Sequence, residues 1–215
     1  MDDFDELIGD QIDGVYALHP DLHDHRHDHP WLHGWLGDVS SPVWFVAENP
    51  SATQVDRIHS ATSTPEDQWA ASRGDRLFRD TLVEHDLKDG EPMAPGGWRC
   101  YITNVMKSEV YVHDWNGTRN EQQLAVAEMW APVLHFELEH GQPELLIVLG
   151  GNAYEAIMHL SRRQLLPDLP PIARLHHYSY VMMRPHRKRG LGPGDPARQT
   201  EWRTQLGDAV KNRHR

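Results

Sequence analysis

The run Leu145 to Leu149, followed by two glycines, is the feature that most constrains the fold of this chain. Five consecutive apolar residues are enough for a buried strand and too few for a helix, and a helical pattern begins directly after Gly150 and Gly151. A strand, a glycine turn and a helix in this order form a βα unit, which is typical of parallel sheets covered on both faces.

Three further segments are short, apolar and rich in β-branched or aromatic residues, and we expect them to be strands: Val43 to Ala47, Tyr101 to Val105 and Tyr178 to Met183. Helical spacing predicts helices between them, over residues 77–83, 120–140 and 153–163, and a last helix from Pro196. The alternation predicts an α/β fold: a three-layer αβα arrangement around a central, mostly parallel, four-stranded sheet. Ligands of such sheets bind beyond the carboxyl ends of the strands.

The length of 215 residues suits one domain, which we divide into an acidic, histidine-rich N-terminal extension, residues 1–41, and an α/β domain, residues 42–215. The N-terminus is acidic where a signal peptide is positively charged, and no apolar run is long enough to cross a membrane, so we expect a cytoplasmic protein. The single cysteine, Cys100, excludes an internal disulfide and a cluster held by several cysteines of this chain, and we expect no cofactor.

The charges are unevenly distributed along the chain. The net charge is -11, yet residues 172–215 hold ten Lys or Arg and only three Asp or Glu. This asymmetry suggests a face that binds anions, although a solvated basic helix on an acidic protein would have the same composition.

Polar residues follow two of the expected strands. Glu48 and Asn49 come directly after Ala47, where a carboxylate and an amide could hold and activate a water molecule, while Asn-Pro-Ser is also good turn chemistry. Asn104 ends the next strand, where a buried amide either braces the backbone or reads a ligand.

A histidine lies among basic residues late in the chain. His186 is flanked by Arg184, Arg187, Lys188 and Arg189, a group suited to phosphate contacts around a histidine that donates to a developing anion. A solvated basic turn is the alternative.

The order of these segments resembles that of the uracil-DNA glycosylase superfamily, from about Val43 to about His186. The resemblance is carried by three runs: Val46-Ala47-Glu48-Asn49-Pro50-Ser51, Tyr101-Ile102-Thr103-Asn104-Val105-Met106-Lys107, and Gln142-Pro143-Glu144-Leu145-Leu146-Ile147-Val148-Leu149-Gly150-Gly151-Asn152-Ala153. It implies a monofunctional DNA glycosylase that flips uracil or a related deaminated base out of DNA and hydrolyses its glycosidic bond, and we expect it to act as a monomer.

The resemblance also implies roles for individual residues. Glu48 and Asn49 would position the attacking water, Asn104 would hydrogen-bond the flipped base, and Pro50 and Ser51 would line the base pocket.

The remaining roles are stacking, anion stabilisation and phosphate binding. An aromatic ring is expected to stack on the base, and Phe78 fits best, with Trp69 second and a plain core role for Phe78 left open. His186 would stabilise the departing base, with His176 and His177 as alternatives. The implied phosphate contacts are Lys107, Arg184, Arg187, Lys188 and Arg189.

The chain departs from the family pattern at three places. Ala47 and Ser51 stand where glycines are usual, Ser108 stands where the iron-sulfur branch has a cysteine, and Arg184-Pro185-His186 replaces a His-Pro-Ser loop. A catalytically silent homologue that binds nucleic acid or a nucleotide through the same pocket is therefore the alternative function.

Four alternating histidines precede the first expected strand: His23, His25, His27 and His29. They could attract a transition metal, and a metal-binding regulatory protein is a third hypothesis. Without a closed ligand set we expect a flexible polar arm here and assign no metal site.

Overall fold

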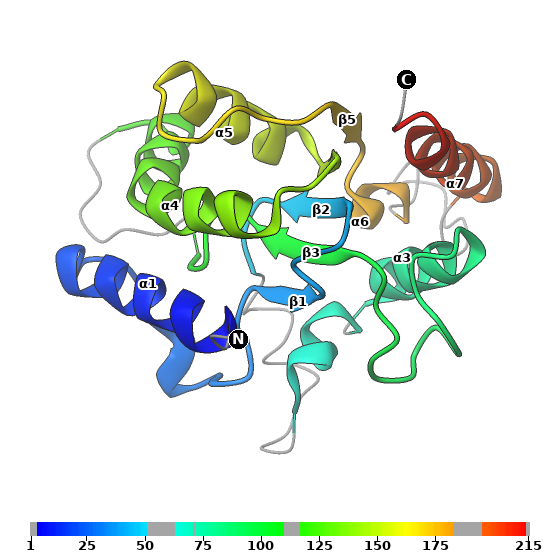
Figure 1. Ribbon diagram of the computed structural model, residues 1–215, viewed down its shortest axis with the longest axis horizontal. Coiled ribbons are helices and arrows are strands. Elements are labelled where there is room, and N and C mark those ends of the chain that lie inside the picture. Colours follow the sequence, from blue (N-terminus) through cyan, green and yellow to red (C-terminus); the bar gives the residue numbers. More distant parts are fainter. Residues whose placement is uncertain (1–3, 51–62, 71, 110–116, 183–194, 214–215) are drawn as a thin grey trace, which may run out of the picture.

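The computed structural model describes residues 4–50, 63–70, 72–109, 117–182 and 195–213. Helices cover both faces of one central sheet, as Figure 1 shows. The expected three-layer α/β class is confirmed.

Four strands of the sheet run parallel: β2 (Val43–Ala47), β3 (Tyr101–Asn104), β4 (Leu145–Leu149) and β5 (Ile172–Leu175). A fifth, β1 (Trp35–Gly37), pairs antiparallel with β3, so the strand order is β1-β3-β2-β4-β5. The sequence predicts four strands because three residues are too few to establish an alternating pattern.

Alternate side chains of the strands face opposite layers. Trp44, Val46 and Tyr101 belong to the core that the sheet shares with three helices, α1 (Phe4–Leu18), α4 (Arg119–Gly141) and α5 (Gly151–Arg162). Phe45 and Ile102 belong to the core on the other face, which is covered by α3 (Arg73–Glu84), α6 (Tyr178–Val181) and α7 (Pro196–Lys211). Burial on both faces explains why the sequences of β2 and β4 are continuously apolar.

The start of α4 is fixed by a capping box. Thr118 accepts the backbone N–H of Glu121, and the carboxylate of Glu121 accepts the backbone N–H of Thr118. The helix predicted over residues 120–140 therefore begins one residue earlier, at Arg119.

The last strand differs from the prediction. Ile172–Leu175 forms β5, paired with β4, whereas the predicted strand from Tyr178 to Met183 is the short helix α6 over its described part. Tyr178 and Val181 are the buried residues of this helix, and their spacing of three suits one helical turn better than a strand.

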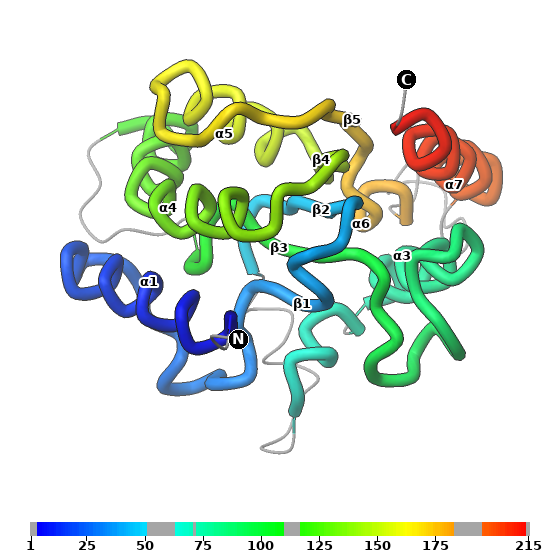
Figure 2. The backbone as a smooth tube through the Cα atoms, in the orientation of Figure 1, coloured from blue at the N-terminus to red at the C-terminus, as the bar shows by residue number. Residues whose placement is uncertain are grey.

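The N-terminal segment is part of the domain, which Figure 2 shows as the blue tube beside α4. Tyr16 of α1 meets Trp130 of α4 edge to face at 5.2 Å, and the guanidinium of Arg26 lies 4.3 Å from the centre of the Tyr16 ring. His25 is buried, and its Nε2 lies 2.9 Å from the Leu32 carbonyl oxygen. The described histidine-rich segment therefore packs on the domain and does not form the expected flexible arm. Residue 41, where we divide the chain, lies between β1 and β2 of the same sheet.

The described residues form neither a cluster of potential metal ligands nor a helix that could span a membrane. No three His, Cys, Asp or Glu side chains gather there in a way that could hold a metal ion. No helix in those same ranges is both long and apolar enough to cross a membrane.

Candidate active site

A pocket of about 480 Å³ lies beyond the carboxyl ends of β2, β4 and β5. It is lined by the residues that follow these strands and by the start of α5: Glu48, Asn49, Leu149, Gly150, Gly151, Asn152, Ala153, His176, His177, Ser179 and Tyr180. This is the position at which parallel sheets bind ligands. The pocket thus brings together Glu48 and Asn49 with the two alternative histidines.

Glu48 is held by the start of α5. Asn152 Nδ2 lies 3.1 and 3.0 Å from its two carboxylate oxygens. Partial burial raises the pKa of Glu48, while the Asn152 hydrogen bond and the charge of Arg119 act in the opposite direction. A carboxylate that is partly desolvated and retains free lone pairs can take a proton from water.

Asn49 lies beside Glu48 on the same loop. Its side-chain Nδ2 donates to the Pro50 carbonyl oxygen at 2.9 Å. That bond orients the amide and leaves Oδ1 as an acceptor at the pocket, so Asn49 is suited to hold a water molecule next to the Glu48 carboxylate.

His177 caps α6, and that bond fixes its tautomer. Its Nδ1 accepts the backbone N–H of Ser179 at 3.2 Å and lies 2.7 Å from the Ser179 hydroxyl. Because Nδ1 accepts, the proton of the neutral ring is on Nε2. Burial lowers the pKa of His177 to about 4, which keeps the ring neutral at pH 7. A neutral ring with a fixed Nε2–H is a hydrogen-bond donor for a developing anion.

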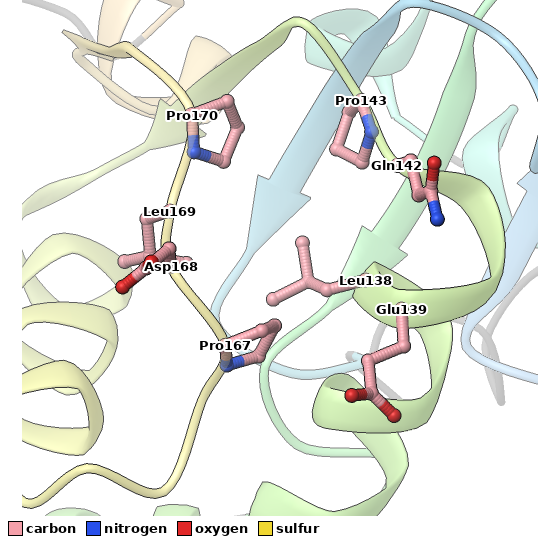
Figure 3. Close-up of a pocket in the computed structure, with 8 residues that line it drawn as sticks. All are labelled: Leu138, Glu139, Gln142, Pro143, Pro167, Asp168, Leu169 and Pro170. Carbon is pink, nitrogen blue, oxygen red and sulfur yellow. The ribbon is translucent and has the colours of Figure 1, made fainter.

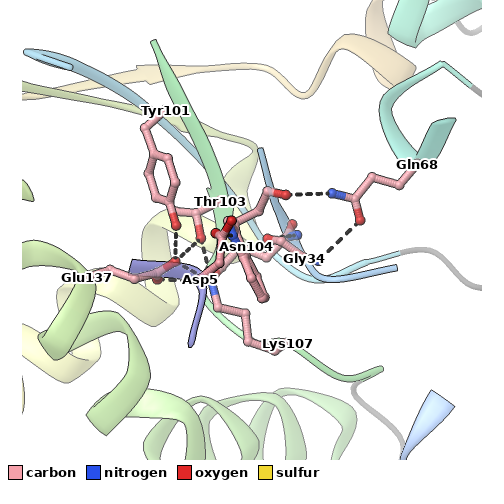
Figure 4. A network of polar contacts seen from close by, with 9 residues as sticks. Asp5, Gly34, Gln68, Tyr101, Thr103, Asn104, Lys107 and Glu137 are labelled. Carbon is pink, nitrogen blue, oxygen red and sulfur yellow. Dashed lines mark hydrogen bonds and ion pairs between the residues drawn. The ribbon is translucent and has the colours of Figure 1, made fainter. Parts of the chain in front are cut away.

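Asn104 is buried next to the pocket but does not line it. It pairs with Ala47 across the sheet, and its Nδ2 donates to the Gly34 carbonyl oxygen at 2.9 Å, at the start of β1 (Figure 4). Its Oδ1 is buried without a partner in the described part of the chain. The Nδ2 contact matches bracing of the backbone, and base recognition by Asn104 stays a prediction.

The Lys107 side chain is buried, whereas the phosphate contact predicted for it requires an exposed side chain. Its Nζ lies 2.8 and 2.9 Å from the carboxylate oxygens of Glu137 and also donates to Thr103, and both charged side chains are buried (Figure 4). Tyr101 donates to the same carboxylate at 2.7 Å. The network ties β3 to α4, and it compensates two buried charges with each other.

Phe78 lies in the core, which excludes the predicted stacking on a base. Its ring is fully buried and stacks on Tyr178 at 5.0 Å, and Phe45 and Trp202 meet it edge to face. Trp69, the second choice, is also buried. The sequence could not separate these roles because an apolar helix position is the same signal in both.

Several predicted residues lie outside the described residues. They are Ser51, Arg184, His186, Arg187, Lys188 and Arg189. Pro50 is described and is buried after Asn49.

The sequence predictions assign no role to Asn152 and give His177 only as an alternative to His186. Asn152 follows the double glycine at the start of a helix. Nothing local in the sequence indicates its contact with Glu48. His177-Tyr178-Ser179 keeps the histidine and serine of a His-Pro-Ser loop, with tyrosine in the middle, and this signal could have identified His177.

A larger hollow of about 650 Å³ lies at the amino ends of β4 and β5, between the end of α4 and the segment 167–170 (Figure 3). Prolines and leucines dominate its lining, and its ionisable lining residues are the acidic Glu139 and Asp168. Acidic walls repel phosphate, so this hollow is unsuited to DNA.

The comparison with protein families agrees with this geometry. Residues 33–193 match the model of the uracil DNA glycosylase superfamily, which includes β1 as well as the pocket. The chain therefore belongs to the uracil DNA glycosylase superfamily. Membership supports a glycosylase-type role in DNA repair, with DNA as the substrate, at the level of the family. A comparison with curated proteins finds no match.

Proposed function

We propose that this protein is a monofunctional DNA glycosylase that hydrolyses the N-glycosidic bond of uracil or a related deaminated base in DNA. The observation that carries the proposal is the shared pocket of Glu48, Asn49 and His177 beyond the carboxyl ends of the sheet. Glu48 and Asn49, after β2, supply acceptors for a water molecule. His177, after β5, supplies a neutral hydrogen-bond donor.

The chemistry follows from these groups. Asn49 and Glu48 hold the water, and Glu48 takes a proton as the water oxygen bonds to C1′ of the deoxyribose. The C1′–N bond breaks, and its electron pair leaves with the base. The base departs as an anion that accepts a hydrogen bond from His177 Nε2–H. The products are the free base and an abasic site.

The DNA backbone requires cationic partners around this pocket. Arg119 lies close enough to influence Glu48, which supports a phosphate contact at the start of α4. The basic residues Arg184, Arg187, Lys188 and Arg189 remain predicted phosphate contacts. His186, the histidine that the sequence favours, also stays a prediction, and His177 takes its role in this proposal.

A substrate panel tests the proposal. The purified protein is incubated with single- and double-stranded oligonucleotides that contain uracil, hypoxanthine or a mismatch, and abasic sites are detected by alkaline cleavage. We expect at least one substrate to be cleaved, and we expect Asn49→Ala and His177→Ala to abolish the cleavage.

The alternative of a catalytically silent homologue gives a different result. It predicts salt-sensitive DNA binding that Asn49→Ala does not change, with no base released from any substrate by folded protein.

A further inference from the structure

A second hollow, of about 200 Å³, adjoins the candidate active site and shares two lining residues with it, His176 and Tyr180. The rest of its lining comes from α6 and from α7, the helix beside it in Figure 1, which contributes Arg198, Glu201, Trp202 and Gln205. A ligand in the candidate active site can therefore extend into this hollow past His176 and Tyr180.

Trp202 fixes the wall between the two hollows. Its side chain is buried, and its Nε1 donates to the His176 carbonyl oxygen at 2.8 Å. This bond ties α7 to the residue that follows β5, so the position of His176 does not depend on the short helix α6 alone. A wall that is already in place loses little conformational entropy when a ligand binds.

Tyr180 is a large aromatic side chain that stays 48% exposed at this wall. Its ring centre lies 5.1 Å from that of His176, at an angle of 33°, and 5.8 Å from the guanidinium carbon of Arg198. Proteins that bind single-stranded nucleic acids use exposed aromatic rings of this kind to stack bases.

Arg198 supplies a positive charge next to the Tyr180 ring. Its Nε lies 3.9 Å from a carboxylate oxygen of Asp195, and the Arg198 side chain is 40% exposed. An ion pair of this length leaves the other N–H groups of the guanidinium able to bind a phosphate oxygen. A stacking ring and a phosphate-binding group thus lie side by side at the edge of the second hollow.

The size and polarity of the second hollow suit one base. Its volume of about 200 Å³ is below the range of pockets for drug-sized ligands, about 300–1,000 Å³. Glu201 and Gln205 line it and hydrogen-bond to each other at 3.1 Å, so they offer polar groups to the edge of a planar ring.

We propose that the second hollow binds the base next to the one that is excised. Tyr180 stacks on this neighbouring base, and Arg198 binds the phosphate between the two nucleotides. The inference rests on the proposed function, because it takes the candidate active site as the place of the flipped base. A base that stacks on Tyr180 has left the stack of a duplex, so the substrate is a single strand or a locally opened duplex.

The test combines base deletion in the substrate with side-chain deletion in the protein. In single-stranded oligonucleotides, either neighbour of the excised nucleotide is replaced by tetrahydrofuran, which keeps the phosphates and lacks the base. The value of kcat/KM is measured for the wild type, Tyr180→Ala, Tyr180→Phe and Arg198→Ala. The matched control is Arg162→Ala, which removes the same charge from the exposed far end of α5.

Removal of the neighbouring base on one side should lower kcat/KM of the wild type about 5- to 100-fold, the range expected for loss of one stacked base. Tyr180→Ala should cause a similar loss on the intact strand and no further loss on the strand that lacks this base. Tyr180→Phe should keep most of the activity, because the ring remains. Arg198→Ala should lower kcat/KM on every strand, and Arg162→Ala should lower it on none.

Two results would overturn the inference: an unchanged kcat/KM in Tyr180→Ala, or an equal loss in that variant whether or not the neighbouring bases are present. The second result would mean that Tyr180 acts on the excised nucleotide itself.

A binding measurement separates this inference from the proposed function. The probe is a single strand with fluorescent 2-aminopurine beside a 2′-fluoro nucleotide, which resists base release. Stacking on Tyr180 should quench the emission in the wild type and not in Tyr180→Ala. If the wild type releases no base from any substrate, the proposed function fails, and quenching that depends on Tyr180 still supports the second hollow as a base-binding site. A strand that does not bind, or quenching that Tyr180→Ala retains, overturns it.

Discussion

Asn152 Nδ2 lies within 3.1 Å of both carboxylate oxygens of Glu48, and so joins the end of β2 to the first turn of α5. The two residues are more than a hundred positions apart in the sequence. Their contact places a partly desolvated carboxylate at the mouth of the pocket with its direction fixed.

Glu48→Gln should reduce the rate of base release about 100- to 10,000-fold, because the amide cannot take a proton from water. Single-turnover cleavage of the best oligonucleotide measures this rate. Glu144→Gln is the matched control, since Glu144 lies before β4 at the opposite end of the sheet. An equal loss in both variants would remove Glu48 from the mechanism.

The Glu48 carboxyl should determine how the rate of base release depends on pH in the acidic range. Burial raises the pKa of Glu48 above its usual 4.5, and only the deprotonated form acts as a base. The rate should therefore rise with pH through a value above 4.5, and this rise should be absent from the residual activity of Glu48→Gln. A profile that is flat from pH 4.5 to 8 in the wild-type protein would contradict the assignment.

Stability should fall on acidification because His177 is buried in its neutral form. Its pKa is lowered from 6.5 to about 4 in the folded protein, so the unfolded chain takes up a proton first as the pH falls. The free energy of unfolding should decrease between pH 6.5 and 4, by at most about 3 kcal/mol from this residue. Urea unfolding of the wild type and His177→Asn over this range should show the smaller decrease in the variant.

Lys107→Met should destabilise the fold by about 3–5 kcal/mol, because it leaves the Glu137 carboxylate buried without its ion pair. Glu137→Gln should restore part of this loss in the double variant. Urea unfolding measures both effects. A Lys107→Met protein of normal stability that binds DNA more weakly would instead support the phosphate contact predicted from the sequence.

Alanine substitution of two helical glycines should change the free energy of unfolding in opposite directions. At Gly141 a Cβ atom would collide with Trp44 and the Val39 carbonyl oxygen, so Gly141→Ala should cost about 1–3 kcal/mol. At Gly9, inside α1, a Cβ would meet nothing within 4 Å, and Gly9→Ala should gain about 0.5–1 kcal/mol. Thermal unfolding of the two variants compares them directly.

The parts of the fold that the sequence predicts are those with a local signal. β2 and β4 are continuously apolar runs because helices cover both faces of the sheet, β3 begins with two apolar residues, and the glycine turn before α5 is equally local. β5 has no such signal, since Ile172–Leu175 contains Arg174 and lies at the end of the sheet. The segment after it, Tyr178 to Met183, is more apolar and therefore has the stronger strand signal in the sequence.

The candidate site was predictable only to the level of residue types at strand ends. Glu48 and Asn49 follow a strand, and a strand end is a local feature. The burial of Lys107 depends on Glu137, thirty residues away, and the exclusion of Phe78 depends on Tyr178 and Trp202, so no local pattern could reveal either.

The antiparallel pairing of β1 with β3 has a consequence for the handling of this protein. Removal of the residues before Pro42 would strip β3 of its neighbour and leave a row of unpaired backbone N–H and C=O groups along it. Such a row is a template for other chains, so a protein shortened to residues 42–215 should aggregate. β1 covers this side of β3, and with only three residues it is too short to pair with a strand of another chain.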